Sequence, residues 1–322
     1  MADWRPSATS ARAHRARVNA LLRAFMSERG VLEVETPILG RGAPLDPGVE
    51  SWRARAPDGA MGYLQTSPEY PMKRLLAAGE GDIYQLARVF RADEQGDRHN
   101  PEFTLLEWYR LGFDDRRLAD EVLELVHTVA AADSRWRRPR PEIRRVRYAE
   151  LFGEAFGLDP GRCSARDCAE AAARVGLTIS GDLDRDGWLD ALMSLVLAPG
   201  FEPDRLTLIH DYPESQAVLA RPSADDPGYA LRFELYWGDL ELANGFYELN
   251  NPRVFVRRRE QDIEQRRRNG QSIPDADRFF ALAMHAGLPD CSGVALGVDR
   301  LLMRLLGAAR IDEVIDFPWG RA

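Results

Sequence analysis

The chain has 322 residues, which is enough for one large globular domain or two small ones. Its net charge of −8 and pI near 5.3 argue against the basic face that nucleic-acid-binding proteins usually present. No apolar run reaches the ~18 residues of a membrane span, and the Arg-rich N-terminus lacks the apolar core of a secretory signal. The three cysteines form no Cys-x-x-Cys pair, which favours free thiols without zinc in a reducing compartment. We therefore expect a cytoplasmic protein that does not enter a membrane.

Arginine supplies nearly all of the positive charge, since Lys73 is the only lysine among 43 lysine and arginine residues. A GC-rich genome is the simplest explanation of this bias. Seven of the arginines lie between Arg135 and Arg147, together with two prolines. We interpret this stretch as an exposed linker with surface ion pairs. Contact with nucleic acid is the alternative, but Trp136 is the only aromatic residue interleaved there.

Two helices are predicted in the first part of the chain, on either side of a short strand at 31–35. Apolar residues recur at helical spacing from Val18 to Met26, and Gly30 follows as a stop. A second helix starts with Ser67 as its N-cap and Pro68 at the first helical position, and it runs to about Ala78.

The rest of the chain mixes long strands with helices and shows no regular βαβ alternation. The remaining expected strands are 31–35, 83–90, 103–109, 205–210, 231–236 and 240–249, and the remaining expected helices are 114–132, 253–269, 275–286 and one from 298. Residues 1–10 are expected to be loose, and three helical segments in 148–200 to form an insertion. This mixture indicates an α+β fold, which we expect to form a single catalytic domain over residues 1–322.

Two segments carry the clearest chemical signal. Residues 91–104 form a polar loop between two apolar segments, with Arg91 at its mouth. A guanidinium there suits the phosphates of a nucleotide triphosphate, because its planar fork contacts two oxygens at once; an ordinary charged hairpin is the alternative. Residues 293–300 bring a second arginine, Arg300, just before an apolar helix. No G-x-x-x-x-G-K-[ST] loop exists, so ATP binding would need another device.

These segments resemble the signature motifs of class II aminoacyl-tRNA synthetases. Residues 91–104 resemble motif 2, residues 293–300 resemble motif 3, and Val34–Pro37 resembles motif 1. Within that class the chain is similar to lysyl-tRNA synthetases and to their shorter paralogues, the elongation factor P–(R)-β-lysine ligases. The resemblance implies the class II catalytic fold, with a mixed, mostly antiparallel sheet flanked by helices, and a homodimer formed through motif 1. Only about thirty residues precede motif 1, too few for the OB-type anticodon-binding barrel of lysyl-tRNA synthetases, which makes tRNA an unlikely acceptor.

The resemblance also implies an adenylation site for ATP. A substrate carboxylate would attack the α-phosphate, while arginines and Mg²⁺ neutralise the developing charge. The two catalytic residues would be Arg91, on the α-phosphate and the attacking carboxylate, and Arg300, on the γ-phosphate or against the face of the adenine ring. Phe103 would stack on adenine, although core packing is the alternative. Further ATP contacts are expected from Ala92, Asp93, His99, Asn100, Glu241, Leu242 and Gly297; Ala92-Asp93 replaces the usual Asn-Glu of the family.

Glu241 and Glu248 are the expected Mg²⁺ ligands. They lie seven residues apart, so an uninterrupted strand would place them on opposite faces. A bend or bulge at Asn244-Gly245 would return them to one face. Judged by residue type alone, both would be interpreted as surface carboxylates rather than metal ligands.

The amino-acid pocket is expected to bind a diamino substrate. Each buried ammonium group needs a carboxylate or phenol partner, which Glu69, Glu107 and Tyr109 would supply. The expected pocket residues are Ser67, Pro68, Glu69, Glu107, Tyr109, Asn244, Glu248 and Ala295. Glu69 could instead pair with Lys73, four residues later on the same helix.

Trp108 and Ala295 resemble the ligases more than the synthetases, which usually have glycine at the second position. One methyl group in a tight pocket discriminates by ~1–3 kcal/mol and could favour a β-amino acid. The segment 250–255 departs from the synthetase pattern, which leaves the amino-acid preference open. We expect an ATP-dependent ligase that adenylates (R)-β-lysine and transfers it to a lysine side chain of elongation factor P. The alternatives are an enzyme that charges a tRNA or another carrier protein, and a non-catalytic amino-acid or nucleotide sensor.

Overall fold

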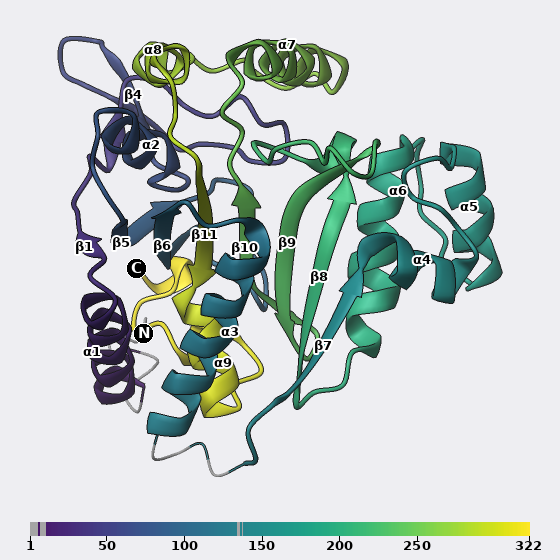
Figure 1. Ribbon diagram of the computed structural model, residues 1–322, viewed down its shortest axis with the longest axis horizontal. Helices are drawn as coiled ribbons and strands as arrows, with labels where there is room; N and C mark the ends of the chain where they lie inside the picture. Colours follow the sequence, from purple (N-terminus) through teal and green to yellow (C-terminus); the bar gives the residue numbers. More distant parts are fainter. Residues whose placement is uncertain (1–5, 7–10, 134–135, 137) are drawn as a thin grey trace.

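The computed structural model describes residues 6, 11–133, 136 and 138–322 (Figure 1). Within these residues the main sheet has eight strands in the order β1-β5-β6-β11-β10-β9-β8-β7. The bounds are β1 Leu32–Glu33, β5 Ile83–Phe90, β6 Glu102–Leu111, β7 Glu142–Arg147, β8 Arg205–Pro213, β9 Tyr229–Trp237, β10 Leu240–Tyr247 and β11 Cys291–Gly297. Neighbouring strands run antiparallel, except that β1 is parallel to β5 and β7 is parallel to β8. The predicted α+β architecture with a mixed, mostly antiparallel sheet is confirmed.

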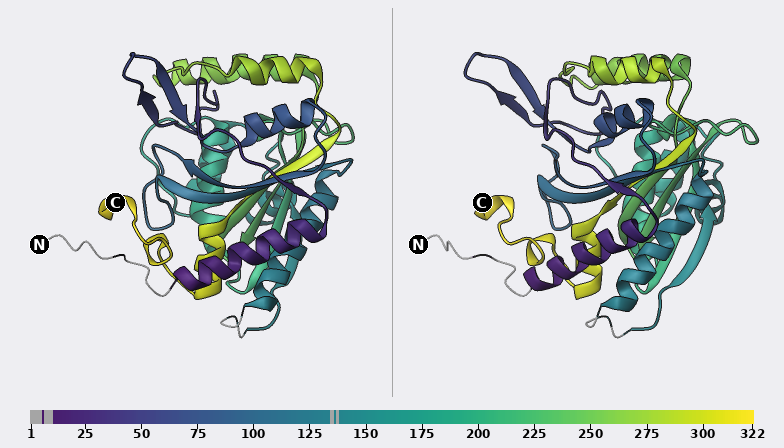
Figure 2. Two further views of the ribbon diagram at one scale, coloured as in Figure 1. Left: turned by 90° about the vertical axis from the view of Figure 1, so that its left-hand side faces the viewer. Right: turned by 60° about the vertical axis from the view of Figure 1, so that its left-hand side comes forward.

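Helices cover both sides of the main sheet, and Figure 2 shows α1 and α7 on opposite sides. The helices of one side, which share the largest apolar cluster, are α1 Arg12–Glu28, α3 Asp115–Ala132 and α9 Val298–Leu306. Those of the other side are α2 Glu69–Ala77, α7 Pro252–Arg268 and α8 Arg278–Ala286, beside a small sheet of β2 Leu39–Gly40, β4 Met61–Leu64 and β3 Arg53–Arg55. Neither sheet is a five-stranded barrel, so the described part of the chain contains no OB-type domain. None of the described helices has the length and hydropathy needed to cross a bilayer.

Capping side chains decide where several predicted helices begin. Helix α2 starts at Glu69, one residue later than expected, and its N-cap is Pro68 instead of Ser67. The Ser67 hydroxyl still accepts the Glu69 N–H at 3.0 Å, just ahead of the first turn. Helix α8 starts three residues later than expected, because the Asp277 carboxylate accepts the N–H groups of Phe279 and Phe280, the second and third residues of the helix. The strand expected at 31–35 is shorter than predicted, because β1 covers only Leu32–Glu33. The expectation that residues 1–10 are loose concerns residues outside the described part of the chain, apart from residue 6.

Part of the arginine-rich stretch 135–147 forms a β-strand where a linker was predicted. Residues 142–147 form β7 at the edge of the main sheet, where they pair in parallel with β8. The interpretation as a linker is therefore wrong for these residues, while residues 134, 135 and 137 lie outside the described part. The expected ion pairs are present, namely Arg138 with Asp204, Arg144 with Glu154, Arg145 with Asp120 and Arg147 with Asp211.

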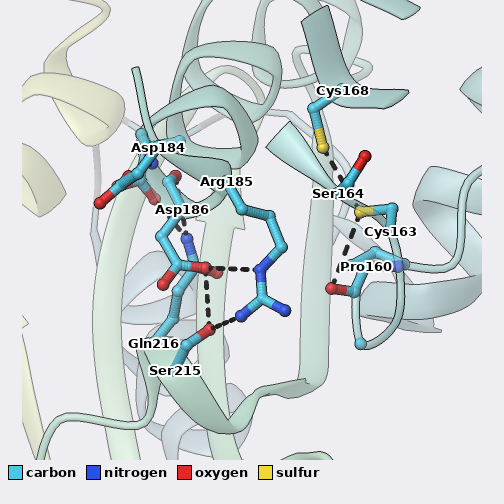
Figure 3. A network of polar contacts seen from close by, with 12 residues as sticks. Pro160, Cys163, Ser164, Cys168, Asp184, Arg185, Asp186, Ser215 and Gln216 are labelled. Carbon is cyan, nitrogen blue, oxygen red and sulfur yellow. Dashed lines mark hydrogen bonds and ion pairs between the residues drawn. The ribbon is translucent and has the colours of Figure 1, made fainter. Parts of the chain in front are cut away.

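The helical insertion packs against the β7 edge of the sheet (Figure 1). It contains α4 Tyr148–Phe156, α5 Ala165–Arg174 and α6 Arg185–Leu192, which share a second apolar cluster with β8 and β9. Figure 3 shows how α6 holds the loop after β8: Asp186 accepts the Ser215 hydroxyl at 2.8 Å, and Arg185 donates to the same hydroxyl at 2.5 Å. The sulfur atoms of Cys163 and Cys168 lie 3.4 Å apart in the same view, and all three cysteines are free thiols, as expected.

Gly245 is a packing constraint within the central strands. A Cβ added there would lie 2.4 Å from Phe233 Cζ on the neighbouring strand β9. We predict that Gly245→Ala lowers the free energy of unfolding by about 1–3 kcal/mol, because the ring has to leave its position. Urea denaturation measures this loss. Gly81→Ala is the matched control, since no atom lies within 4 Å of its added Cβ; equal stability of the two variants would contradict the packing argument.

Candidate active site

Four adjacent strands align polar residues in one row. Their register pairs Glu107 of β6 with Ala295 of β11, Ala295 with Asn244 of β10, and Asn244 with Glu234 of β9. Directly paired residues on neighbouring strands project from the same face of a sheet. The structure therefore brings three predicted pocket residues side by side. It adds Glu234, which sequence reasoning missed; the signal was a carboxylate within a strand whose other residues, apart from Arg232, are apolar or aromatic.

Arg91 and Arg300 act on a common set of side chains, although they lie far apart in the chain. Arg91 pairs with Glu94 at 2.7 Å. Arg300 donates to the Glu241 carbonyl at 3.0 Å and contacts its carboxylate at 3.3 Å, and another of its nitrogens lies 2.7 Å from His99 Nε2. Burial opposes ionisation of Glu94, but Arg91, His99 and Arg300 together hold its pKa below the usual value. The motif 2 loop and the start of α9 thus form one cationic corner, and Glu94, also missed from sequence, balances it.

The motif 2 loop contains three predicted ATP residues in different states. Asp93 is exposed on a turn. Burial, followed by the Arg300 charge, lowers the pKa of His99, so its imidazole is neutral near pH 7. Asn100 is buried and binds the protein at both ends of its amide: the nitrogen donates to the Glu102 carbonyl at 2.6 Å, and the oxygen accepts the Trp319 N–H at 2.9 Å. In this structure the Asn100 side chain therefore shapes the loop.

The other predicted ATP residues would offer the nucleotide mainly backbone atoms, together with the aromatic ring of Phe103. Leu242 is buried in the main apolar cluster, and the Ala92 N–H donates to the Glu50 carbonyl at 2.8 Å. Phe103 is half-buried, with its ring centre 5.1 Å from the Arg91 guanidinium. A Cβ at Gly297 would approach no protein atom closer than 3.7 Å. Protein packing alone therefore does not require a glycine at this position. Its absent side chain instead leaves space for a ligand.

The acidic end of the row is built around Glu107. Its two carboxylate oxygens accept the Ser67 hydroxyl at 2.7 Å and the Tyr109 hydroxyl at 2.8 Å. Burial, with a contribution from the nearby Glu69 charge, raises the pKa of Glu107 to about 8, even though the two hydrogen bonds favour ionisation. Glu107 is thus mostly protonated near pH 7. A bound ammonium group would draw that proton off.

Lys73 joins two of the predicted pocket carboxylates. Its ammonium nitrogen lies 2.6 Å from Glu69 Oε1 and 2.5 Å from Glu248 Oε2. The Lys73 and Glu248 side chains are each 1% exposed, whereas Glu69 is 21% exposed. The alternative expectation, that Glu69 pairs with Lys73 along α2, is confirmed. The contact with Glu248 was not foreseen, because no sequence pattern places α2 against the end of β10.

Gly293 makes room for the acidic end and was also missed. Its register partner on β6 is Tyr109. A Cβ at residue 293 would lie 2.3 Å from the Tyr109 ring and 2.5 Å from the Glu248 carboxylate. Without a side chain here, the phenol and the carboxylate can both lie over β11.

The two predicted metal ligands have separate partners. The expected irregularity in β10 exists, but it lies between Glu241 and Ala243 instead of at Asn244-Gly245. Glu241 faces Arg300, and burial and the Glu234 charge raise its pKa, which suits a site that accepts a cation. Glu248 is already bound by Lys73. Among the described residues no cluster of three or more His, Cys, Asp or Glu side chains could hold a metal, so the donor set fits Mg²⁺ only where ATP oxygens complete the shell around Glu241.

Asn244 is tied to the helical insertion through Arg232. Arg232 Nε donates to Asn244 Oδ1 at 3.3 Å, and the same guanidinium binds Glu234 and the Gln216 carbonyl. The Gln216 side chain in turn donates to Asp190 of α6 at 2.8 Å. The insertion therefore supports one wall of the pocket.

Comparison with known proteins identifies the family of this chain. The family described as tRNA synthetases class II (D, K and N) matches residues 2–321. A Yersinia enterocolitica protein named elongation factor P–(R)-β-lysine ligase is 43% identical, over 100% of this chain and 99% of its own length. Proteins of that name from Vibrio vulnificus and Haemophilus ducreyi are 40% and 41% identical, each over 99% of this chain and 98% and 97% of their own lengths. The chain belongs to the class II tRNA synthetase family, in the branch of the elongation factor P–(R)-β-lysine ligases.

Proposed function

We propose that this protein activates (R)-β-lysine with ATP and transfers it from the adenylate to a lysine side chain of elongation factor P. The observation that carries the proposal is a corner with two arginines, from the motif 2 loop and α9, that is joined through Glu241 to the same strands that hold the acidic pocket. The full-length similarity to proteins named for this reaction supports it. Charging of a tRNA or another carrier protein is the second candidate; a sensor would have no use for both arginines.

At the cationic corner, ATP would lie between Arg91 and Arg300. Arg91 would hold the α-phosphate and the attacking carboxylate in line, and Arg300 would bind the γ-phosphate. Both guanidinium groups now bind protein carboxylates, which phosphate oxygens would replace as partners. The neutral His99 beside Arg300 can donate a hydrogen bond to an outer phosphate. Mg²⁺, when bound at Glu241, would neutralise part of the triphosphate charge.

The charge of the acidic end fits a diamino acid. With Glu107 ionised, the carboxylates of Glu69, Glu107 and Glu248 face the single ammonium of Lys73, which leaves two negative charges. Two substrate ammonium groups would balance them, while the substrate carboxylate extends towards Arg91. The methyl group of Ala295 lies in the same row and would restrict where the amino group nearest the carboxylate can lie.

The assembly and its partners follow from the same proposal. Leu32, Ile38 and Leu39, beside the motif 1 strand, expose 45–56% of their surface, which supports the expected homodimer through this region. Elongation factor P is the acceptor that the names of the relatives indicate. A cytoplasmic location stays a prediction that fits free thiols.

Arg91→Ala is predicted to lower amino-acid-dependent pyrophosphate exchange roughly 10³-fold or more, because one donor to the developing phosphate charge is lost. The exchange of labelled pyrophosphate into ATP measures this. Arg166→Ala is the control, since that arginine lies on the insertion and pairs with Glu170 on its own helix. Exchange of Arg91→Ala at the control level would remove Arg91 from the reaction.

The affinity for the amino acid should rise with pH. A bound ammonium requires ionised Glu107, whose pKa is about 8 in the empty pocket, so below that pH binding must release a proton. The apparent affinity should improve roughly tenfold for each pH unit up to about pH 8 and then level off. Calorimetric titration of (R)-β-lysine from pH 6 to 8.5 measures this. Glu107→Gln should bind more weakly and without this slope; a slope that persists in the variant would assign the proton elsewhere.

Substrate and acceptor can be separated in one series. We expect exchange with (R)-β-lysine to exceed exchange with α-lysine, and the labelled amino acid to appear on elongation factor P and not on tRNA. Mass spectrometry of both acceptors measures the transfer. Transfer to tRNA alone would support the second candidate, and no exchange with any amino acid would support a sensor.

A further inference from the structure

The buried ammonium of Lys73 lies between two elements of the amino-acid pocket. It reaches from α2, where Glu69 is its first partner, to the end of β10, where Glu248 is its second. We propose that Lys73 is a positioning residue for the amino-acid substrate, fixing the carboxylates of Glu69 and Glu248 so that they can receive substrate ammonium groups. This inference rests on the proposed function, because it assigns those carboxylates to the substrate.

Stability alone does not account for a charge at this position. Both neighbours of Lys73 that fill the same side of α2, Met72 and Leu76, are buried and apolar. Ion pairs taken fully out of water often stabilise a fold no better than apolar residues of similar volume, because desolvation opposes the attraction. A methionine would suit the packing of α2 at least as well. What the apolar residue cannot do is hold two carboxylates in place.

The choice of lysine is itself informative in this chain. Every other basic position among the 43 is arginine, including the buried Arg258 and Arg266. Those arginines spread their donors over several carbonyl groups, as Arg266 does with Leu45, Asp46 and Val49. Lysine instead offers a compact tetrahedral ammonium, which fits between two carboxylate oxygens at 2.6 and 2.5 Å. The one position where arginine was not used is therefore the one where a wide planar group would push the two carboxylates apart.

Removing this ammonium should change protonation in the pocket. Burial opposes the charge on Lys73, but Glu248 and Glu69 more than offset it and raise its pKa, so it stays protonated. Burial raises the pKa of Glu248, and Lys73 pulls it down. The other titratable or charged groups that face these three residues include Tyr70 of α2, Glu107 and Tyr109 of β6, Cys291 of β11, and Arg221 with its partner Asp290. Without Lys73, mutual repulsion of the carboxylates would make the pocket bind an additional proton.

The test compares Lys73→Met with the wild-type protein in pyrophosphate exchange, with (R)-β-lysine varied at each pH from 6.5 to 9. At pH 7 we expect the KM for (R)-β-lysine to rise about tenfold or more, while the KM for ATP stays within twofold. The ratio of variant to wild-type KM should fall as the pH rises, because the extra proton then dissociates before substrate binds. Use of the ratio removes the slope that Glu107 gives to both proteins.

Lys73→Arg separates charge from shape and keeps the fold if the methionine variant does not fold. We expect a KM for (R)-β-lysine at least about fivefold above wild type, with a ratio that does not change with pH, because the charge remains and the geometry does not. A wild-type KM in Lys73→Arg would overturn the argument from shape.

Arg266→Met is the matched control. It also removes a buried cation, one that binds Glu50 and loop carbonyl groups outside the amino-acid pocket. It should lower the melting temperature without a pH-dependent KM ratio. If the KM of Lys73→Met for (R)-β-lysine equals that of the wild type, or if the ratio of the two KM values is as independent of pH as in the control, Lys73 is a merely structural residue. Absence of exchange in the wild-type protein would instead contradict the proposed function. The wild-type and variant proteins would then be compared by calorimetric binding of (R)-β-lysine.

Discussion

The antiparallel register of β6, β11, β10 and β9 is the constraint on which the site depends. Because opposite residues share a face, this register alone sets Glu107, Ala295, Asn244 and Glu234 in one row. A shift of one residue in any strand would turn its member of the row into the core on the other side. On each strand, the apolar residues next to the row lie on the opposite face and pack beneath α1, α3 and α9. Their burial prevents such a shift. The core therefore specifies the site as much as it stabilises the fold.

Charge is divided between two regions of the site that lie at opposite ends of β10. The motif 2 loop and α9 supply arginines near Glu241 at its start, and α2, β6 and the residue after its end supply carboxylates. Each region carries an internal counter-charge in the empty protein: Glu94 for the arginines and Lys73 for the carboxylates. Counter-charges of this kind keep desolvated groups in place before substrate arrives, so less rearrangement is needed during the reaction.

Small residues at close crossings make the arrangement possible. Gly245 admits the Phe233 ring, and Gly293 admits both Tyr109 and Glu248 over β11. The helical insertion contributes from farther away, because its contacts with the loop after β8 fix the carbonyl that Arg232 binds, and Arg232 binds Asn244. The wall nearest Ala295 thus depends on an element with no catalytic motif of its own.

The sequence by itself determined the α+β class, the order of the long elements and the motif segments with Arg91 and Arg300, because local periodicity and short-range spacing are written in consecutive residues. It also identified the carboxylates of the pocket through the resemblance of their motifs. Only the tertiary structure decided which groups meet: that Glu94 is the partner of Arg91, that Glu234 joins the row, that the irregularity of β10 lies at Glu241 to Ala243, and that Lys73 reaches Glu248. Each of these depends on strand register or on the packing of a helix against a distant strand end. Such contacts arise between residues far apart in the chain, and no periodicity within one segment encodes them.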